Sequence, residues 1–193
     1  MPVRLTLEIK LWNPGEQERI FTGDDLIANW ATLNSDKQLL QAIMLDNFRM
    51  VLSVDGKVVS RCAFMYDGES SPDLMYLYEQ HLPALYQGQS VTIEFFEEMT
   101  AWRLIPENKE DMKWEVIDNS AGLDSINVEN EGVCKRLPFV TAAMDWLAKA
   151  IEVMEKYKEN KKAAGGEDLT SQIEYAHRLL DFSRKTLSGV GWR

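Results

Sequence analysis

Histidine and cysteine are scarce in this chain of 193 residues, which contains two of each. Neither His81 nor His177 has a second histidine three or four residues away, so an HExxH-type zinc site is absent. Cys62 and Cys134 are 72 positions apart without a CxxC motif, and the expectation for such cysteines in a reducing compartment is a buried, reduced thiol. We therefore predict no metal site, no catalytic residue and no cofactor.

Long apolar runs and phosphate-binding loops are also missing. No stretch approaches the roughly 18 apolar residues of a membrane span, and the first residues lack the pattern of a signal peptide, so the expected location is the cytoplasm. The Gly165-Gly166 pair is not followed by the Lys-Ser/Thr of a phosphate loop and is interpreted as a linker. Residues 127–132 imitate the start of a calcium loop, but Pro138 stands where the bidentate glutamate is needed.

Basic residues are few in the middle of the chain, and this is its most informative property. Residues 66–132 contain fifteen acidic residues and three basic ones, which gives that stretch a net charge of −12 within a chain of net charge −10. A negative field attracts basic proteins and cations, whereas it repels nucleic acid and anionic membranes. The composition therefore favours a basic protein partner, no nucleic acid and no membrane.

Alternation of polar and apolar residues predicts strands through the first two thirds of the chain. The hairpin around Asp55-Gly56 is the strongest of these signals, because both turn positions require positive φ angles. The expected strands are 3–12, 18–22, the two arms of 47–65, 90–99, 100–106 and 112–118, with a short strand at 125–128 as a further candidate. The predicted fold class is α+β, a mostly antiparallel sheet of about six to seven strands with a C-terminal pair of amphipathic helices.

From Pro138 onward the apolar residues recur at steps of three and four, which predicts helices. The domain prediction is a sheet-rich core over 1–137 and a helical hairpin over 138–193, packed together as one domain. The last apolar stripe, Leu169–Leu187, either packs beside the first helix or is offered to another chain. The second arrangement would make the protein a homodimer.

Carboxylates and aromatic side chains alternate along the acidic strands, and this pattern defines the candidate site. The predicted partner-binding residues are Glu94, Phe96, Glu98, Trp102, Glu107, Glu110, Asp111 and Glu115. Aromatic anchors surrounded by charge of one sign are typical of a protein–protein hot spot. Three other interpretations remain open: core packing for Trp102, a plain solvated face for the carboxylates, and a catalytic pair formed by Glu94 and Glu98.

In layout and composition the chain resembles the small acidic immunity proteins that bacteria pair with secreted toxins. The features that carry the resemblance are the strand 3–12, the hairpin 47–65, the acidic strands 90–118 and the helix from Pro138. The resemblance implies a non-enzymatic inhibitor that covers the active site of a basic cognate toxin. The alternatives are an oligomerising adaptor that uses Leu169–Leu187 and an enzyme with a carboxylate site.

Overall fold

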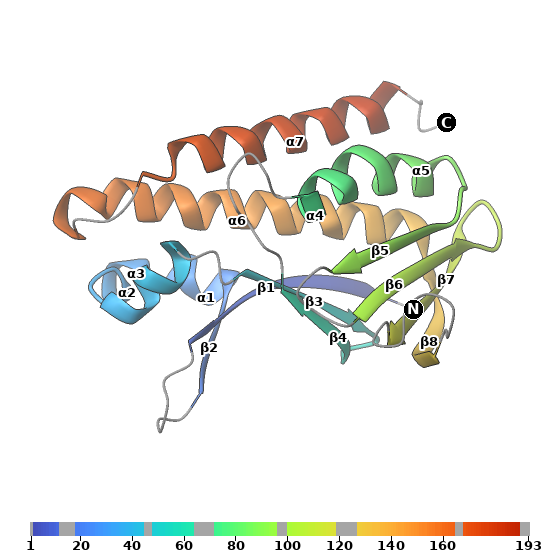
Figure 1. Cartoon of the computed structure of the whole chain (residues 1–193), viewed down its shortest axis with the longest axis horizontal. Coiled ribbons are helices and arrows are strands. Elements are labelled where there is room, and N and C mark those ends of the chain that lie inside the picture. The colour runs from blue at the N-terminus through green and yellow to red at the C-terminus, as the bar shows by residue number, and fades with distance from the viewer. Residues whose placement is uncertain are drawn as a thin grey trace.

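Two four-stranded antiparallel sheets lie beside a layer of helices in the computed structural model of this chain (Figure 1). The structure describes residues 2–11, 18–44, 48–63, 72–95, 100–118, 127–164 and 168–189. The predicted α+β class and the antiparallel pairing are confirmed. The predicted strand count of six to seven is wrong, because the described residues form eight strands divided equally between two sheets.

The first sheet has the strand order β2-β1-β3-β4. Its strands are β1 (Val3–Leu11), β2 (Arg19–Thr22), β3 (Phe48–Val54) and β4 (Lys57–Ala63). Along β1 the residues Leu5, Leu7, Ile9 and Leu11 are buried, as their alternation predicts. Asp55 and Gly56 have φ angles of 51° and 75°, so the two-residue turn between β3 and β4 has the geometry expected of an Asp-Gly hairpin.

Three short helices separate β2 from β3: α1 (Gly23–Ala28), α2 (Trp30–Leu33) and α3 (Lys37–Met44). Thr22 caps α1 with a reciprocal capping box, in which its hydroxyl accepts from the Asp25 backbone N–H. The Asp36 carboxylate accepts from the backbone N–H groups of Gln38 and Leu39 at the start of α3. Both helix starts are therefore set by local side chains.

The second sheet has the strand order β5-β6-β7-β8. Its strands are β5 (Val91–Phe95), β6 (Thr100–Pro106), β7 (Asp111–Asp118) and β8 (Asn127–Lys135). The sequence predicts only a short strand at 125–128, whereas β8 continues to Lys135. The alternation that marks a half-buried strand is absent because β8 is an edge strand with most of its residues exposed. Gly132 is required within it, since a Cβ there would lie 2.7 Å from Cζ2 of Trp114.

A π-helical turn, η2 (Tyr76–His81), joins α4 (Pro72–Met75) to α5 (Leu82–Tyr86). Within this turn the Leu82 N–H donates to the Leu77 carbonyl, five residues back. The next such donor would be Pro83, which has no N–H, so the Tyr78 carbonyl loses its backbone partner. The buried Ser183 hydroxyl donates to that carbonyl instead, at 3.2 Å.

Two long helices complete the fold, α6 (Arg136–Ala164) and α7 (Thr170–Gly189). Figure 1 shows α6 running along both sheets, with α7 on the side of α6 that faces away from the first sheet. The stripe on the last helix is buried inside this chain, and its members are Leu169, Ile173, Ala176, Leu180, Ser183 and Leu187. Of the two arrangements that the sequence allows, the structure has the one in which α7 packs beside α6. A single hydrophobic cluster joins both sheets to these helices.

Candidate functional site

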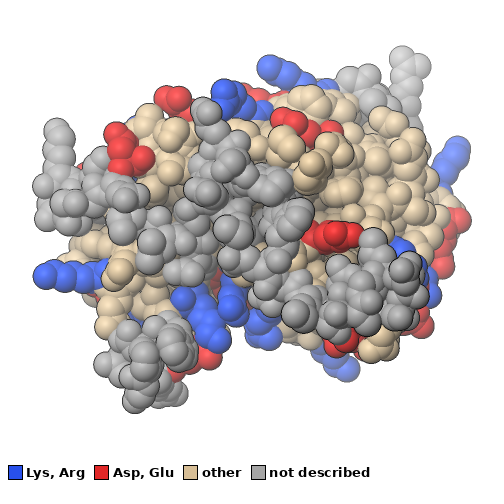
Figure 2. Space-filling model, viewed as in Figure 1, with Lys and Arg blue, Asp and Glu red and all other residues tan. Residues whose placement is uncertain are grey.

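The two sheets carry charge of opposite sign. Among the described residues of the second sheet and its turns there are eight acidic and four basic residues, whereas the first sheet and its turns have three acidic and six basic ones. Figure 2 shows Lys and Arg side chains gathered below the centre of the view, over the first sheet. Only three of the ten net negative charges belong to described residues, so most of the acidic excess lies outside them.

The β6–β7 turn presents two of the predicted site residues, Glu107 and Glu110, to solvent. Asn108 fixes the turn, because its side-chain oxygen accepts from the backbone N–H groups of both Glu110 and Asp111 at 2.8 Å. The Glu107 N–H donates to the Asp111 carbonyl at 3.0 Å and closes the turn. Local hydrogen bonds therefore hold the backbone of the turn, and both glutamate side chains are exposed.

Basic residues from the β8–α6 junction dock against this turn. Lys135 bridges the Glu110 and Asp111 carboxylates, at 2.9 Å from each. Hydrogen bonds from Lys135 and then from Asn108 hold the pKa of Asp111 below its usual value. The turn is thus partly neutralised, and Asp111 contributes less free charge than its sequence position suggests.

Glu115 lies on the outward side of the second sheet in an ion-pair network. Its side chain contacts both Arg103 on β6 and Lys113 on its own strand, and Lys113 also reaches Glu131 on β8 at 2.7 Å. Burial alone would raise the pKa of Glu115, but the hydrogen bonds from Lys113 and Arg103 outweigh it and the pKa falls below its usual range. Because Glu115 is only 4% exposed and fully paired, its position indicates a structural role and not a contact surface.

Trp102 lies in the core and is 1% exposed. Its ring meets Phe95 and Phe139 edge-on, and its indole N–H donates to the Ser60 hydroxyl at 2.9 Å. The structure therefore supports core packing for Trp102. The prediction that Trp102 is an exposed anchor for a partner is wrong, because the ring is buried. Phe96 and Glu98 lie outside the described residues.

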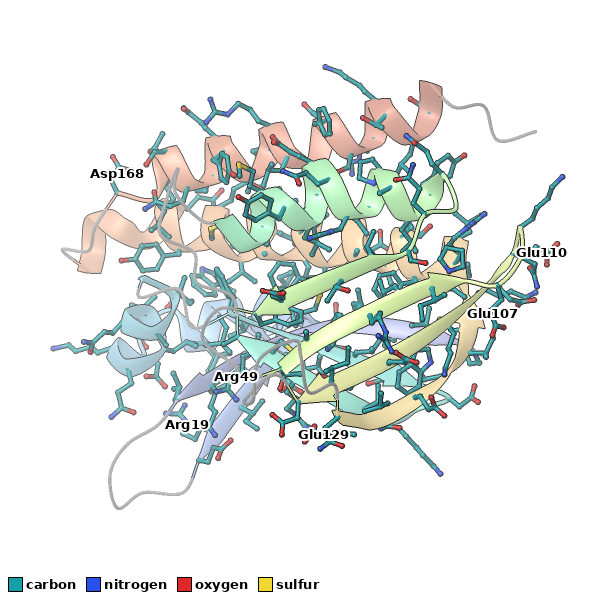
Figure 3. All side chains as sticks on the ribbon, turned by 45° about the vertical axis from the view of Figure 1, so that its right-hand side comes forward. Arg19, Arg49, Glu107, Glu110, Glu129 and Asp168 are labelled. Carbon is teal, nitrogen blue, oxygen red and sulfur yellow. The ribbon has the colours of Figure 1, made fainter. Side chains whose placement is uncertain are left out.

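The predicted residues that are exposed do not form one cluster. Glu94 is near the end of β5, where the β5–β6 connection begins, whereas Glu107 and Glu110 follow the far end of β6. Glu107 is six positions after Ala101, the partner of Glu94, which along a strand corresponds to about 20 Å. Figure 3 shows Glu107 and Glu110 together at the hairpin tip and Glu129 well away from them.

Sequence reasoning missed part of this surface. Glu129 and Glu131 belong to β8 and are exposed on the edge of the acidic sheet, but they lie beyond the short strand predicted at 125–128. It also missed the basic outward face of the first sheet, where the residues are Arg4, Lys10, Arg49 and Arg61. The signal for this second feature is visible in the sequence, because Arg4 and Lys10 occupy polar positions of an alternating strand.

Within the described part of the chain, no group of three or more His, Cys, Asp or Glu side chains is placed to hold a metal ion. The same residues include no helix that is both long and apolar enough to cross a membrane. Comparisons with protein-family models, with curated proteins and with solved structures found no match to this chain. Function is therefore inferred from the surface geometry and charge of the described residues.

Proposed function

We propose that this protein is a non-enzymatic binding protein of the immunity type, which neutralises a basic toxin in the cytoplasm by covering its active site. The observation that carries the proposal is the acidic surface of the second sheet. Its exposed carboxylates come from β5, the β6–β7 turn and β8, and the members are Glu94, Glu107, Glu110, Glu129 and Glu131. We name this set the acidic surface.

Three members of the acidic surface are not paired with any described residue and can form ion pairs with a partner. Glu94, Glu107 and Glu129 form no ion pair with any other described residue. Among the described residues Glu110 pairs only with Lys135, and its side chain is 75% exposed. An exposed pair of this kind contributes at most about 1 kcal/mol and is readily exchanged for a pair across an interface.

The spread of the acidic surface fits one protein interface. A standard interface covers about 800 Å² on each partner, which as a round patch is roughly 30 Å wide. Both ends of the second sheet, about 20 Å apart, fall within that width. Charges at this spacing are screened from one another at physiological salt, so each would act on the partner locally and their effects on association would add.

The alternative of an adaptor that dimerises through Leu169–Leu187 has weaker support. That stripe already packs within the chain, so a dimer built on it would have to expose a buried surface first. The alternative of an enzyme with a carboxylate site stays a prediction, because Glu98 of the predicted pair lies outside the described residues. Glu115 is unsuited to act as a general acid, because two cations hold it ionised.

The test is affinity capture at low salt from cells that make the protein, followed by kinetics with the captured partner. We expect a basic protein that is toxic when produced alone and harmless when produced together with this chain. A variant with Glu94, Glu107, Glu110 and Glu129 all changed to Lys should associate more slowly by about ten- to a hundredfold at low salt. The difference should shrink as salt is added.

A matched control reverses four exposed carboxylates on α6 and α7, at Glu155, Glu159, Glu174 and Asp181. It changes the net charge equally, so it should slow association by less than about threefold if the acidic surface makes the contact. Equal slowing by both variants would mean that only net charge matters and would refute the assigned surface. A captured partner that is acidic, or harmless when produced alone, would refute the function.

A further inference from the structure

Strand β1 has an open edge along its first half. β2 pairs with β1 only from Glu8 to Leu11, because the chain leaves the sheet at Gly23 to begin α1. On the other side, β3 pairs with β1 from Val3 to Ile9. Among the described residues, no strand therefore lies beside Val3–Leu7 on the side of β2.

The register shows which backbone groups point toward that edge. The Asp55 N–H donates to the Pro2 carbonyl at 3.0 Å, which makes Pro2 and Asp55 a hydrogen-bonded pair at the start of the ladder. Because such pairs alternate in an antiparallel ladder, Arg4 and Thr6 bond to β3, and the N–H and C=O groups of Val3 and Leu5 point away from it. No other described residue forms a hydrogen bond to those groups of Val3 and Leu5.

The open edge borders a groove of about 820 Å³, within the size range of ligand sites. Val3, Arg4 and Leu5 line one side, and one face of α6 from Leu137 to Glu152 lines the other. That length of helix spans about 22 Å, which matches about six residues of extended chain. A strand edge facing a helix across a hollow is the arrangement that strand-adding peptide sites use.

Charge at the groove favours a basic occupant. Lys149 pairs with Asp24 at 2.8 Å where the groove meets α1, so these two charges cancel. The groove also holds Asp145 and Glu152 on α6 against Arg4 on β1, and none of the three has an ion pair with another described residue. The surplus is one negative charge, on the helix wall.

We propose that this groove binds an extended segment of a partner protein, which adds to β1 as a strand where β2 leaves the sheet. The backbone groups of Val3 and Leu5 form the ladder with the segment. A basic side chain of the segment lies against Asp145 and Glu152. This site is on the first sheet and does not depend on the acidic surface of the second.

Amide hydrogen exchange of the free protein, followed by NMR, tests the open edge without a ligand. The Thr6 amide is paired with β3 and the Leu5 amide is not, so Leu5 should exchange at least about tenfold faster. Equal protection of the two amides would mean that the edge is already covered, and it would overturn the proposal.

Fluorescence anisotropy with a labelled heptapeptide of alternating valine and lysine tests the occupant. We expect saturable binding with a Kd below about 1 mM, together with slower exchange of the Leu5 amide. Methylation of alternate peptide nitrogens should abolish binding, because it removes the donors of a strand ladder. Glutamate in place of lysine in the peptide should weaken binding.

Two protein variants complete the test. Asp145→Lys should weaken binding of the valine–lysine peptide by about fivefold, and the matched control Glu159→Lys, on the same helix outside the groove, by less than about twofold. Absence of binding, insensitivity to methylation, or equal effects of the two variants would each overturn the proposal. A dimer in solution that Asp145→Lys dissociates would also overturn it, because the occupant would then be a second copy of the chain.

Discussion

Replacing Ser183 with alanine tests whether its hydroxyl substitutes for the backbone hydrogen bond that the Tyr78 carbonyl lacks in the π-helical turn. In the structure the Ser183 hydroxyl is the donor to the Tyr78 carbonyl, because Pro83 cannot donate to it. Both Ser183 and Tyr78 are buried, so in Ser183→Ala the carbonyl is left without a partner and without water. The cost of a buried, unsatisfied carbonyl is about 1–3 kcal/mol. For a chain of this length, about 2 kcal/mol lowers the Tm by roughly 4–8 °C.

Urea denaturation followed by tryptophan fluorescence measures the free energy of unfolding of each variant. Ser188→Ala is the matched control, since the hydroxyl of this exposed serine on the same helix donates to the Lys185 carbonyl. It should change stability by less than about 0.5 kcal/mol. If both alanine variants lose the same stability, the Tyr78 carbonyl does not need Ser183 and the reasoning is refuted.

A double-mutant cycle with Pro83→Ala sharpens the test. Alanine at position 83 restores a backbone N–H at the place where a π-helical bond to the Tyr78 carbonyl would form. The cost of Ser183→Ala should therefore be smaller by about 1 kcal/mol in the Pro83→Ala background. An unchanged cost would show that the two residues do not serve the same carbonyl.

Two further predictions concern the second sheet. Gly132→Ala should lower the free energy of unfolding in urea denaturation by about 1–3 kcal/mol, because its Cβ would lie 2.7 Å from the Trp114 ring. The control is Val133→Ala, at the exposed neighbouring residue. A loss of stability in Gly132→Ala no greater than in Val133→Ala would contradict this prediction. The lowered pKa of Glu115 contributes stability that is present above its unfolded value near 4.5 and lost as pH falls through the folded pKa. Glu115→Gln should therefore flatten the loss of stability below pH 4.5 and cost about 1–2 kcal/mol at pH 7, by leaving Arg103 and Lys113 without their shared carboxylate. Wild-type and Glu115→Gln curves that run parallel below pH 4.5 would contradict it.

At the candidate site the sequence predicts which carboxylates are exposed, but not which side chains are paired or buried. The sequence correctly marks Glu107 and Glu110 as exposed carboxylates, because a polar turn between two strands has no way to bury them. It cannot tell that Glu115 is paired, since Arg103 is twelve residues away and reaches it only through strand pairing. Nor does it locate Trp102, whose burial depends on Phe139 in a helix far along the chain.

What the sequence determines by itself is the local structure. The alternation in β1, the Asp55-Gly56 turn and the apolar stripe of α6 each follow from contacts within a few residues, and each is present where it is predicted. The tertiary structure alone decides that the strands divide into two sheets, that β8 continues to Lys135, and that α7 buries its stripe inside the chain. These outcomes depend on contacts between distant segments, whose free energy is set by the fit of whole surfaces and leaves no pattern in a short stretch of sequence.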